Sequence, residues 1–229
     1  MRPESARRGA IVTGGASGIG AVTAALLRDA GYEVVTVDLL AAADVKGDVR
    51  EPGTAKRALE ALTTPPGVLV NCAGITKGGL VEKTSLEDWN LVVGVDLTGA
   101  FVFTQAVAPA MALAGGGRIV NVASTLALRA RRGTSAYAAA KAGLIGFTRA
   151  CARDYGRSGI NVNAVAPGLV ETKLSEQIPA ETRARLIEET ALGRSAKPED
   201  VAEVILFLCS PASRHITGEC IRVDGGQLA

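Results

Sequence analysis

The feature that most constrains the fold of this chain is a series of short runs with apolar residues at consecutive positions. Valine and isoleucine are frequent in these runs, and both favour strands because branched side chains pack well on a pleated sheet. Strands exposed on one face alternate apolar and polar residues, so continuous runs predict strands covered on both faces. The predicted strands span residues 10–13, 33–37, 68–71, 118–122, 160–165 and 220–223.

Stretches with apolar residues at helical spacing separate most of these strands. Several end at a glycine, a common stop signal for a helix. The predicted helices span residues 21–31, 54–62, 86–114, 135–156 and 198–208. Strands and helices that alternate in this way predict an α/β fold, a parallel sheet doubly wound with helices on both faces.

The organisation of the chain predicts a single domain over residues 1–229, because no repeat, low-complexity tract or linker divides it. The segment at about 172–197 differs from the rest, since it is polar, helical and inserted just before the last strand. We expect this segment to form a small lid or substrate lobe. The helix that follows opens with Pro198 and two acids, a favourable first turn.

The charge balance argues against several classes of partner. The chain has 25 lysines and arginines and 23 acids, a formal charge of +2, so neither a nucleic-acid nor a membrane surface is expected. Its most apolar region, residues 91–114, contains Asp96, Gln105 and Pro109 and is not predicted to span a membrane. The apolar run after the N-terminal arginines ends too soon for a signal peptide. We therefore expect a cytoplasmic protein.

The four cysteines, Cys72, Cys151, Cys209 and Cys220, lie far apart and form no CxxC pair. The lone His215 is distant from three of them, so zinc spacing is absent and no metal site is predicted. Two disulfides could form in principle, but scattered cysteines in an alanine-rich chain indicate small buried apolar residues. A reducing, intracellular setting is expected.

The first predicted strand runs directly into a glycine-rich turn, "IVTGGASGIG". Gly14, Gly18 and Gly20 stand where the backbone amides of a helix N-terminus can approach a pyrophosphate closely. The spacing is T-G-x-x-x-G-x-G and not G-x-G-x-x-G, and any tight strand–helix connection can require a glycine. Its place between a strand and a helix favours a dinucleotide site.

Asp38 ends the second predicted strand, where dinucleotide folds place an acid on the adenosine ribose. A carboxylate there accepts hydrogen bonds from the ribose hydroxyls and repels a 2′-phosphate. No arginine or lysine stands within residues 36–45 to bind that phosphate. We therefore predict NAD as the cofactor in preference to NADP, although Asp38 could also be an ordinary acidic loop residue.

The stretch "SAYAAAKAG" (135–143) places one phenol and one ammonium among alanines and glycines. Tyr137 and Lys141 are four residues apart and so share one face of a helix. They could be a half-buried core tyrosine and a solvated lysine. The alternative is a proton-transfer site, in which the small neighbours let a cofactor and a substrate approach the helix.

Seven motifs together resemble the short-chain dehydrogenase/reductase family over almost the full length of the chain. They are "TGGASGIG", "GDV" (47–49), "NCAG" (71–74), "NVAS" (121–124), "YAAAK" (137–141), "PGLVET" (167–172) and "ITGECIRVDGG" (216–226). The second asparagine of the family's NNAG segment is replaced by Cys72. The resemblance implies a single Rossmann domain with a seven-stranded parallel sheet.

The resemblance also implies which residues bind the cofactor, with Asp48 at the adenine base and Val170 and Thr172 at the nicotinamide. The implied cofactor-binding residues are Gly14, Ser17, Gly18, Ile19, Gly20, Asp38, Asp48, Val49, Asn71, Ala73, Gly74, Tyr137, Lys141, Pro167, Gly168, Val170 and Thr172.

Catalysis in the family couples hydride transfer to a proton transfer on the substrate oxygen. Tyr137 would be the acid/base, but an unperturbed phenol has a pKa of about 10. The positive charge of Lys141 would favour phenolate, and in the family this lysine also holds the nicotinamide ribose. Ser124 would hydrogen-bond the substrate oxygen.

Asp96 departs from the pattern, since the family usually has asparagine there to bend a helix and hold a water that links the lysine to solvent. Asp96 could be a fourth catalytic residue or a structural helix residue.

The substrate is predicted to contact Ser124, Leu126, Tyr137 and Leu169, with further apolar contact from Leu174 and Ile178. Arginines at 129, 131 and 132 lie between the serine and the tyrosine. They could form a basic rim that attracts an anionic substrate, such as a carboxylate, a phosphate or a carrier-bound thioester, or they could be a solvated surface loop.

These residues together predict an NAD(H)-dependent oxidoreductase that acts on a secondary alcohol or ketone. One alternative is an NADPH-dependent reductase of 3-oxoacyl thioesters, because the closing motifs also resemble that subgroup. A remote alternative is a non-catalytic dinucleotide-binding or sensing module, which would have no need of Ser124, Tyr137 and Lys141. From the resemblance we also expect a homodimer or homotetramer that pairs through the helices at 86–114 and 135–156.

Overall fold

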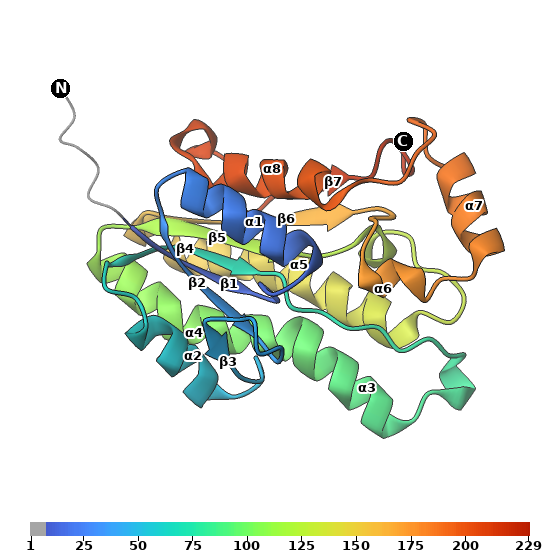
Figure 1. Cartoon of the computed structure of the whole chain (residues 1–229), viewed down its shortest axis with the longest axis horizontal. Coiled ribbons are helices and arrows are strands. Elements are labelled where there is room, and N and C mark those ends of the chain that lie inside the picture. Colours follow the sequence, from blue (N-terminus) through green and yellow to red (C-terminus); the bar gives the residue numbers. More distant parts are fainter. Residues whose placement is uncertain (1–7) are drawn as a thin grey trace.

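The computed structural model describes residues 8–229, so most of the arginine-rich N-terminal segment lies outside the described part of the chain. The strands are β1 (Gly9–Thr13), β2 (Glu33–Asp38), β3 (Val45–Lys46), β4 (Pro66–Asn71), β5 (Gly117–Val122), β6 (Ile160–Pro167) and β7 (Cys220–Val223). The helices are α1 (Gly18–Asp29), α2 (Pro52–Glu60), α3 (Leu86–Val93), α4 (Gly99–Leu113), α5 (Ser135–Tyr155), α6 (Lys173–Glu176), α7 (Ala180–Glu188) and α8 (Pro198–Cys209). Figure 1 shows their arrangement.

All seven strands form one parallel sheet in the order β3-β2-β1-β4-β5-β6-β7. The chain winds outward from β1 to β3 and then returns to β4 on the other side of β1. At such a reversal the connections after neighbouring strands run to opposite faces, which opens a crevice at the carboxyl ends of the strands. The predicted seven-stranded, doubly wound fold is confirmed.

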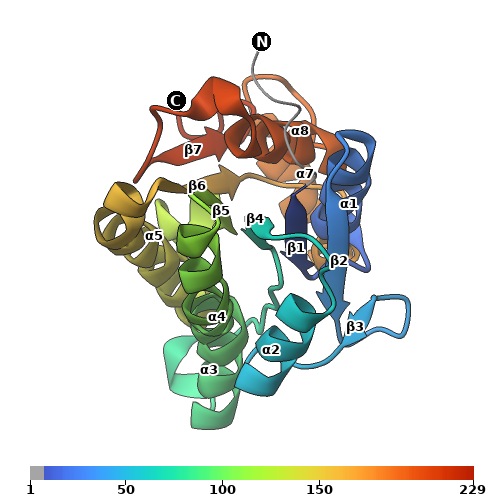
Figure 2. The same cartoon turned by 90° about the vertical axis from the view of Figure 1, so that its left-hand side faces the viewer.

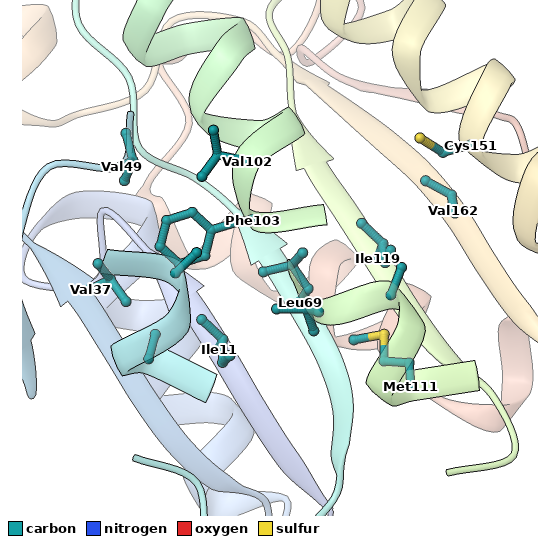
Figure 3. Close-up of a cluster of buried hydrophobic side chains, with 14 of the residues drawn as sticks. Ile11, Val37, Val49, Leu69, Val102, Phe103, Met111, Ile119, Cys151 and Val162 are labelled. Atoms are coloured by element: carbon teal, nitrogen blue, oxygen red, sulfur yellow. The ribbon is translucent and has the colours of Figure 1, made fainter. Parts of the chain in front are cut away.

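Two layers of helices cover the sheet, and each layer has its own apolar core. Helices α2, α4 and α5 pack on one face and helices α1 and α8 on the other (Figure 2). In the first core Phe103 is fully buried and belongs to the same cluster as Ile11, Leu69 and Met111 (Figure 3). Burying a side chain of this size contributes roughly 1.5–3 kcal/mol. Because both faces are covered, the strands read as continuous apolar runs.

Helices α3 and α4 form one rod, in which a π-helical turn, Gly94–Thr98, joins the two α-helices. The rod Leu86–Leu113 is long and apolar enough to span a membrane by length and composition alone, with a mean hydropathy of 1.7. Half of its most apolar stretch is nevertheless buried inside the molecule. Phe103, Val107 and Met111 belong to the core against the sheet, so the rod is a core element.

The structure differs from the sequence-based expectations in a few elements. The strand β3 pairs only Val45 and Lys46 with β2, which is too short for a pattern to reveal. The expected helix at 86–114 contains the π-helical turn, and the polar segment at 172–197 forms the two short helices α6 and α7. All four cysteines are free; Cys151 and Cys209 are buried, while Cys72 and Cys220 are only partly so.

Candidate active site

A cleft of about 810 Å³ lies at the carboxyl ends of the strands. It runs from Asp38 after β2, past the glycine turn and the ends of β4 and β5, to the segment that carries α6 and α7. All the residues expected to bind the cofactor line this cleft except Asn71. The expected substrate residues Ser124, Leu126, Tyr137 and Leu169 line it too.

Asn71 differs from the expectation because its side chain is buried below the cleft. Its amide nitrogen donates to the Asn121 side-chain oxygen at 2.8 Å, and the Asn121 amide nitrogen donates to the Thr148 hydroxyl at 2.8 Å. This chain of hydrogen bonds joins β4, β5 and α5. The Asn71 amide therefore supports the floor of the cleft and does not line it.

In the glycine turn, backbone segments lie so close to one another that a side chain would not fit between them. Gly14 and Gly18 have φ angles of +66° and +52°, which residues with a side chain rarely adopt. A Cβ on Gly20 would lie 2.2 Å from the carbonyl oxygen of Gly14. Within residues 8–229, the side chain of Ser17 forms no cap to α1, so the first N–H groups of this helix are available to an anion. The turn fits the diphosphate of a dinucleotide.

Two aspartates lie at the adenosine end of the cleft. Asp38 accepts hydrogen bonds from the backbone N–H groups of Ala16 at 3.2 Å and Leu40 at 3.1 Å, which orient its carboxylate. Asp48 is held by the Arg50 guanidinium, whose hydrogen bonds lower the pKa of that carboxyl below its usual range. Arg50 also lines the cleft and was missed by the sequence analysis, because nothing in its spacing sets it apart.

Lys141 is buried at the centre of the site and is not a solvated helix lysine. Its Nζ donates to the carbonyl oxygen of Val122 at 2.9 Å and lies 3.3 Å from Oδ2 of Asp96. The same Nζ is 5.6 Å from the centre of the Tyr137 ring, one turn back along α5. The structure therefore brings the phenol and the ammonium together at the end of β5.

Asp96 reaches Lys141 from the π-helical turn between α3 and α4. The turn is one residue wider than an α-helical turn, a feature often found at functional sites. Oδ1 of Asp96 accepts the backbone N–H of Ile75 at 2.8 Å, and Asp96 is itself buried. Gly74 leaves room for this pair, since a Cβ there would lie 3.2 Å from the Lys141 Nζ.

The pKa values of the three groups are coupled. Burial raises the pKa of Asp96 above its usual range, although Lys141 opposes the rise. Burial by itself lowers the pKa of Lys141, but the charges of Asp96 and Tyr137 outweigh it and the pKa is raised. Lysine 141 therefore carries its positive charge at neutral pH.

The pKa of Tyr137 corrects one sequence-based expectation. Burial raises it above its usual range, and the charge of Asp96 adds to the rise. Lys141 and the Ser124 hydroxyl lower it as expected, but they do not outweigh burial. Lys141 alone therefore does not make the phenol acidic in the free protein, because burial of the ring and, to a smaller extent, the negative charge of Asp96 oppose its effect.

Ser124 lies two residues after the end of strand β5 and lines the cleft. Its hydroxyl oxygen accepts the backbone N–H of Leu126 at 3.1 Å. This contact occupies an acceptor position and leaves the hydroxyl hydrogen free to donate. A substrate oxygen placed between Ser124 and Tyr137 could therefore receive a hydrogen bond from each.

The segment with α6 and α7 contributes to the wall of the cleft. Leu169, Leu174 and Ile178 line the cleft there, as expected. Arg131 and Arg132 line it as well, whereas Arg129 does not and contacts Glu189 at 2.8 Å. Two of the three arginines between Ser124 and Tyr137, Arg131 and Arg132, therefore lie at the cleft.

Comparison with known proteins places this arrangement among nicotinamide enzymes. The sequence profile of a family described as Enoyl-(Acyl carrier protein) reductase matches residues 14–227. A 3-oxoacyl-(acyl-carrier-protein) reductase, FabG of Thermotoga maritima, is 39% identical over 94% of this chain and 96% of its own length. The cis-4-hydroxycyclohexanecarboxylate dehydrogenase of Sinomonas cyclohexanicum is 39% identical over 98% of each chain.

The fold has similar solved structures. A Beutenbergia cavernae protein, assigned as an NAD(P)-dependent gluconate 5-dehydrogenase, superposes with a TM-score of 0.91 at 34% identity, over 98% of each chain. Its crystal structure holds NADP at low occupancy.

The charge of Asp96 generates a prediction about the Tyr137 phenol. Asp96→Asn removes a negative charge that raises the pKa of Tyr137, so we expect this pKa to fall. The ultraviolet absorbance of tyrosinate measures it, after subtraction of the titration of a Tyr137→Phe variant. Asp88→Asn, the same change at an exposed site on α3, is the control. An unchanged Tyr137 titration in Asp96→Asn would contradict the electrostatic role.

Proposed function

This chain belongs to the short-chain dehydrogenase/reductase family of NAD(P)-dependent oxidoreductases that act on hydroxyl and keto groups, and we propose that Ser124, Tyr137 and Lys141 are its catalytic residues. The observation that most supports this assignment is the buried Lys141 ammonium beside the Tyr137 ring, at the end of a cleft that begins with a phosphate-binding turn. A protein that only bound or sensed a dinucleotide would have no need of this acid/base pair.

The cofactor supplies the hydride, or accepts it, when it is bound along the cleft. Tyr137 donates a proton to the carbonyl oxygen of a ketone in reduction and accepts it from the alcohol in oxidation. Ser124 donates a hydrogen bond to the same oxygen and stabilises the charge that develops on it. Both groups line the same end of the cleft.

Lys141 has two tasks in this proposal. An ammonium has three donors; one donates to the Val122 carbonyl, and the Asp96 carboxylate lies beside the group as its ionic partner, with Oδ2 at 3.3 Å. A further donor is available to a ribose hydroxyl of the cofactor. The positive charge also stabilises the Tyr137 phenolate, an effect that Asp96 moderates. Asp96 acts through Lys141 and is therefore a positioning residue.

NAD is proposed as the preferred cofactor because of Asp38. Its carboxylate is oriented by two backbone N–H groups and retains further acceptor positions for ribose hydroxyls. Arg50, which lines the cleft at this end, is already bound by Asp48, although Lys46 lies beside Asp38 on the neighbouring strand β3. The NADP held by the Beutenbergia cavernae relative is an observation that favours NADP instead.

The substrate is proposed to be a secondary alcohol or ketone that carries a negative charge. One relative at 39% identity is named for a hydroxy acid, cis-4-hydroxycyclohexanecarboxylate, whose carboxylate is anionic. The thioester reductase from Thermotoga maritima also supports a second candidate function, the reduction of 3-oxoacyl thioesters.

The enzyme is proposed to be a cytoplasmic homodimer or homotetramer that pairs through α4 and α5. Phe101 of α4 is 45% exposed, although it is a large aromatic residue. Its ring packs edge-to-face on Phe147 of α5 with centroids 6.3 Å apart. Two long helices that share an exposed aromatic pair offer a self-complementary surface to a second copy.

Tyr137→Phe is expected to lower kcat by about 10²–10⁴-fold, because it removes only the hydroxyl that moves the proton. Affinity for the cofactor should remain, as measured by calorimetry. Tyr155→Phe makes the same change at the far end of α5 and serves as the control. Turnover that survives Tyr137→Phe would refute the catalytic assignment.

The wild-type enzyme is expected to use NAD at least about tenfold more efficiently than NADP, from steady-state kcat/KM with both cofactors. Asp38→Ala removes the repulsion of a 2′-phosphate and should reduce this ratio about tenfold or more. Asp29→Ala, at an exposed site at the end of α1, should leave the ratio unchanged. A wild-type preference for NADP would overturn the proposal.

Phe101→Glu is expected to convert the oligomer to smaller species in light scattering, since it buries a charge in the proposed interface. Val81→Glu introduces the same charge at an exposed apolar residue ahead of α3 and should not change the mass. A wild-type protein that is monomeric at micromolar concentration would contradict the proposed pairing.

A further inference from the structure

The charged residues that line the cleft are unevenly distributed. Among the described residues, the acids in the lining are Asp38 and Asp48, and both lie at the adenosine end. On the substrate side the lining contains Arg131, Arg132 and Arg185, and no acid of the described chain accompanies them there. The end of the cleft that would receive the substrate is therefore cationic.

These arginines come from two separate elements that meet at the rim. Arg131 and Arg132 belong to the loop between Ser124 and α5, and Arg185 belongs to α7. Glu189, just after α7, joins the two: Oε2 lies 3.4 Å from Nη2 of Arg131, and Oε1 lies 4.0 Å from Nε of Arg185. The carboxylate thereby holds the guanidinium groups of both elements at the same place.

One carboxylate does not neutralise this cluster. Glu189 also binds Arg129 at 2.8 Å, so three guanidinium groups share a single negative charge. Arg132 forms no ion pair within 4.0 Å in the described part of the chain and adds a further positive charge. Several N–H donors of Arg131, Arg132 and Arg185 therefore remain for a ligand, because each guanidinium carries five.

The surroundings of Arg131 strengthen its attraction for an anion, whereas Arg132 and Arg185 are exposed. Arg131 is only 25% exposed, and burial lowers its pKa while Glu189 opposes the effect. The lining beside it includes the apolar residues Leu169, Leu174 and Leu186. A guanidinium that has lost part of its hydration and has an incomplete ionic partner binds a carboxylate or phosphate more strongly than a solvated one.

The diphosphate of the cofactor has its own place in the cleft. The glycine turn that fits it lies beside Thr172, since a Cβ on Gly18 would be 3.2 Å from the Thr172 methyl group. Lys173 follows Thr172 and therefore lies near the glycine turn. Arg131 and Arg132 are carried instead by the loop that connects the two proposed catalytic residues, Ser124 and Tyr137.

We propose that Arg131, Arg132 and Arg185 form a subsite for an anionic group, a carboxylate or a phosphate, on the part of the substrate away from its reacting carbon. The inference rests on the proposed function for the place of the reacting carbon. The anion bridges the loop after β5 and the helix α7, so its binding also fixes α7 over the cleft. Glu189 is the positioning residue that gathers two of the three arginines.

The test measures binding without turnover. Calorimetry of the NAD-saturated enzyme compares three probes that share one ring and lack a reacting hydroxyl: cyclohexanecarboxylate, cyclohexyl phosphate and cyclohexanecarboxamide. We expect at least one anion to bind about tenfold or more tightly than the uncharged amide, as for one charge-assisted hydrogen bond. The preferred anion distinguishes a carboxylate substrate from a phosphate one.

Arg132→Gln and Arg185→Gln should each weaken binding of that anion about tenfold and leave the amide unchanged. Arg157→Gln makes the same charge change beyond the far end of α5 and should alter neither. Equal binding of all three probes, absence of anion binding, or an equal loss for anion and amide in the variants would each overturn the subsite.

The outcome is separable from that of the proposed function. Selective binding of the anion together with full turnover by Tyr137→Phe would leave the subsite standing and refute the catalytic assignment. Loss of turnover in Tyr137→Phe without any selectivity for the anion would refute the subsite alone.

Discussion

The buried ammonium of Lys141 is the constraint on which the rest of the site depends. A buried cation without a partner costs several kcal/mol, so the surrounding chain must supply acceptors. The acceptors come from two elements, the Val122 carbonyl at the end of β5 and the Asp96 carboxylate on the π-helical turn. Removing one partner of such a pair typically costs about 3–5 kcal/mol. The ion pair therefore fixes the relative positions of β5, α5 and the rod that contains α3 and α4.

Small residues then provide the space around this fixed point. Gly74 lies beside the ion pair, Gly14 and Gly20 let backbone approach backbone, and the buried alanines of α5 let that helix lie close to its neighbours. The cleft is consequently formed mainly by backbone and by a few reactive side chains. This arrangement explains why one stretch of the chain combines alanines and glycines with a tyrosine and a lysine.

The sequence predicts the fold well because most of the long strands are buried on both faces and are therefore mainly apolar, although Asn161 and Asn163 interrupt the run in β6. It does not predict β3, which has two residues, or the π-helical turn, whose apolar spacing matches that of the flanking helix. The residues placed at the cleft also follow from motifs, whereas their catalytic roles remain a prediction. Contacts between distant positions were not foreseen: Glu189 is 58 residues from Arg131. The raised pKa of Tyr137 could not be predicted either, because it depends on the burial of the ring and on Asp96, the ionic partner of Lys141.

The two ionic clusters of this molecule differ in their access to water. The pair of Lys141 and Asp96 is almost completely enclosed, whereas Arg129, Glu189 and Arg185 are partly solvated. Dissolved ions screen exposed charges over a Debye length of about 8 Å at physiological ionic strength, but they act weakly on enclosed ones. Salt thus screens the charges at the mouth of the cleft and not the enclosed pair of Lys141 and Asp96. A rise in ionic strength would weaken the capture of an anion at the proposed subsite and leave the proposed acid/base pair unaffected.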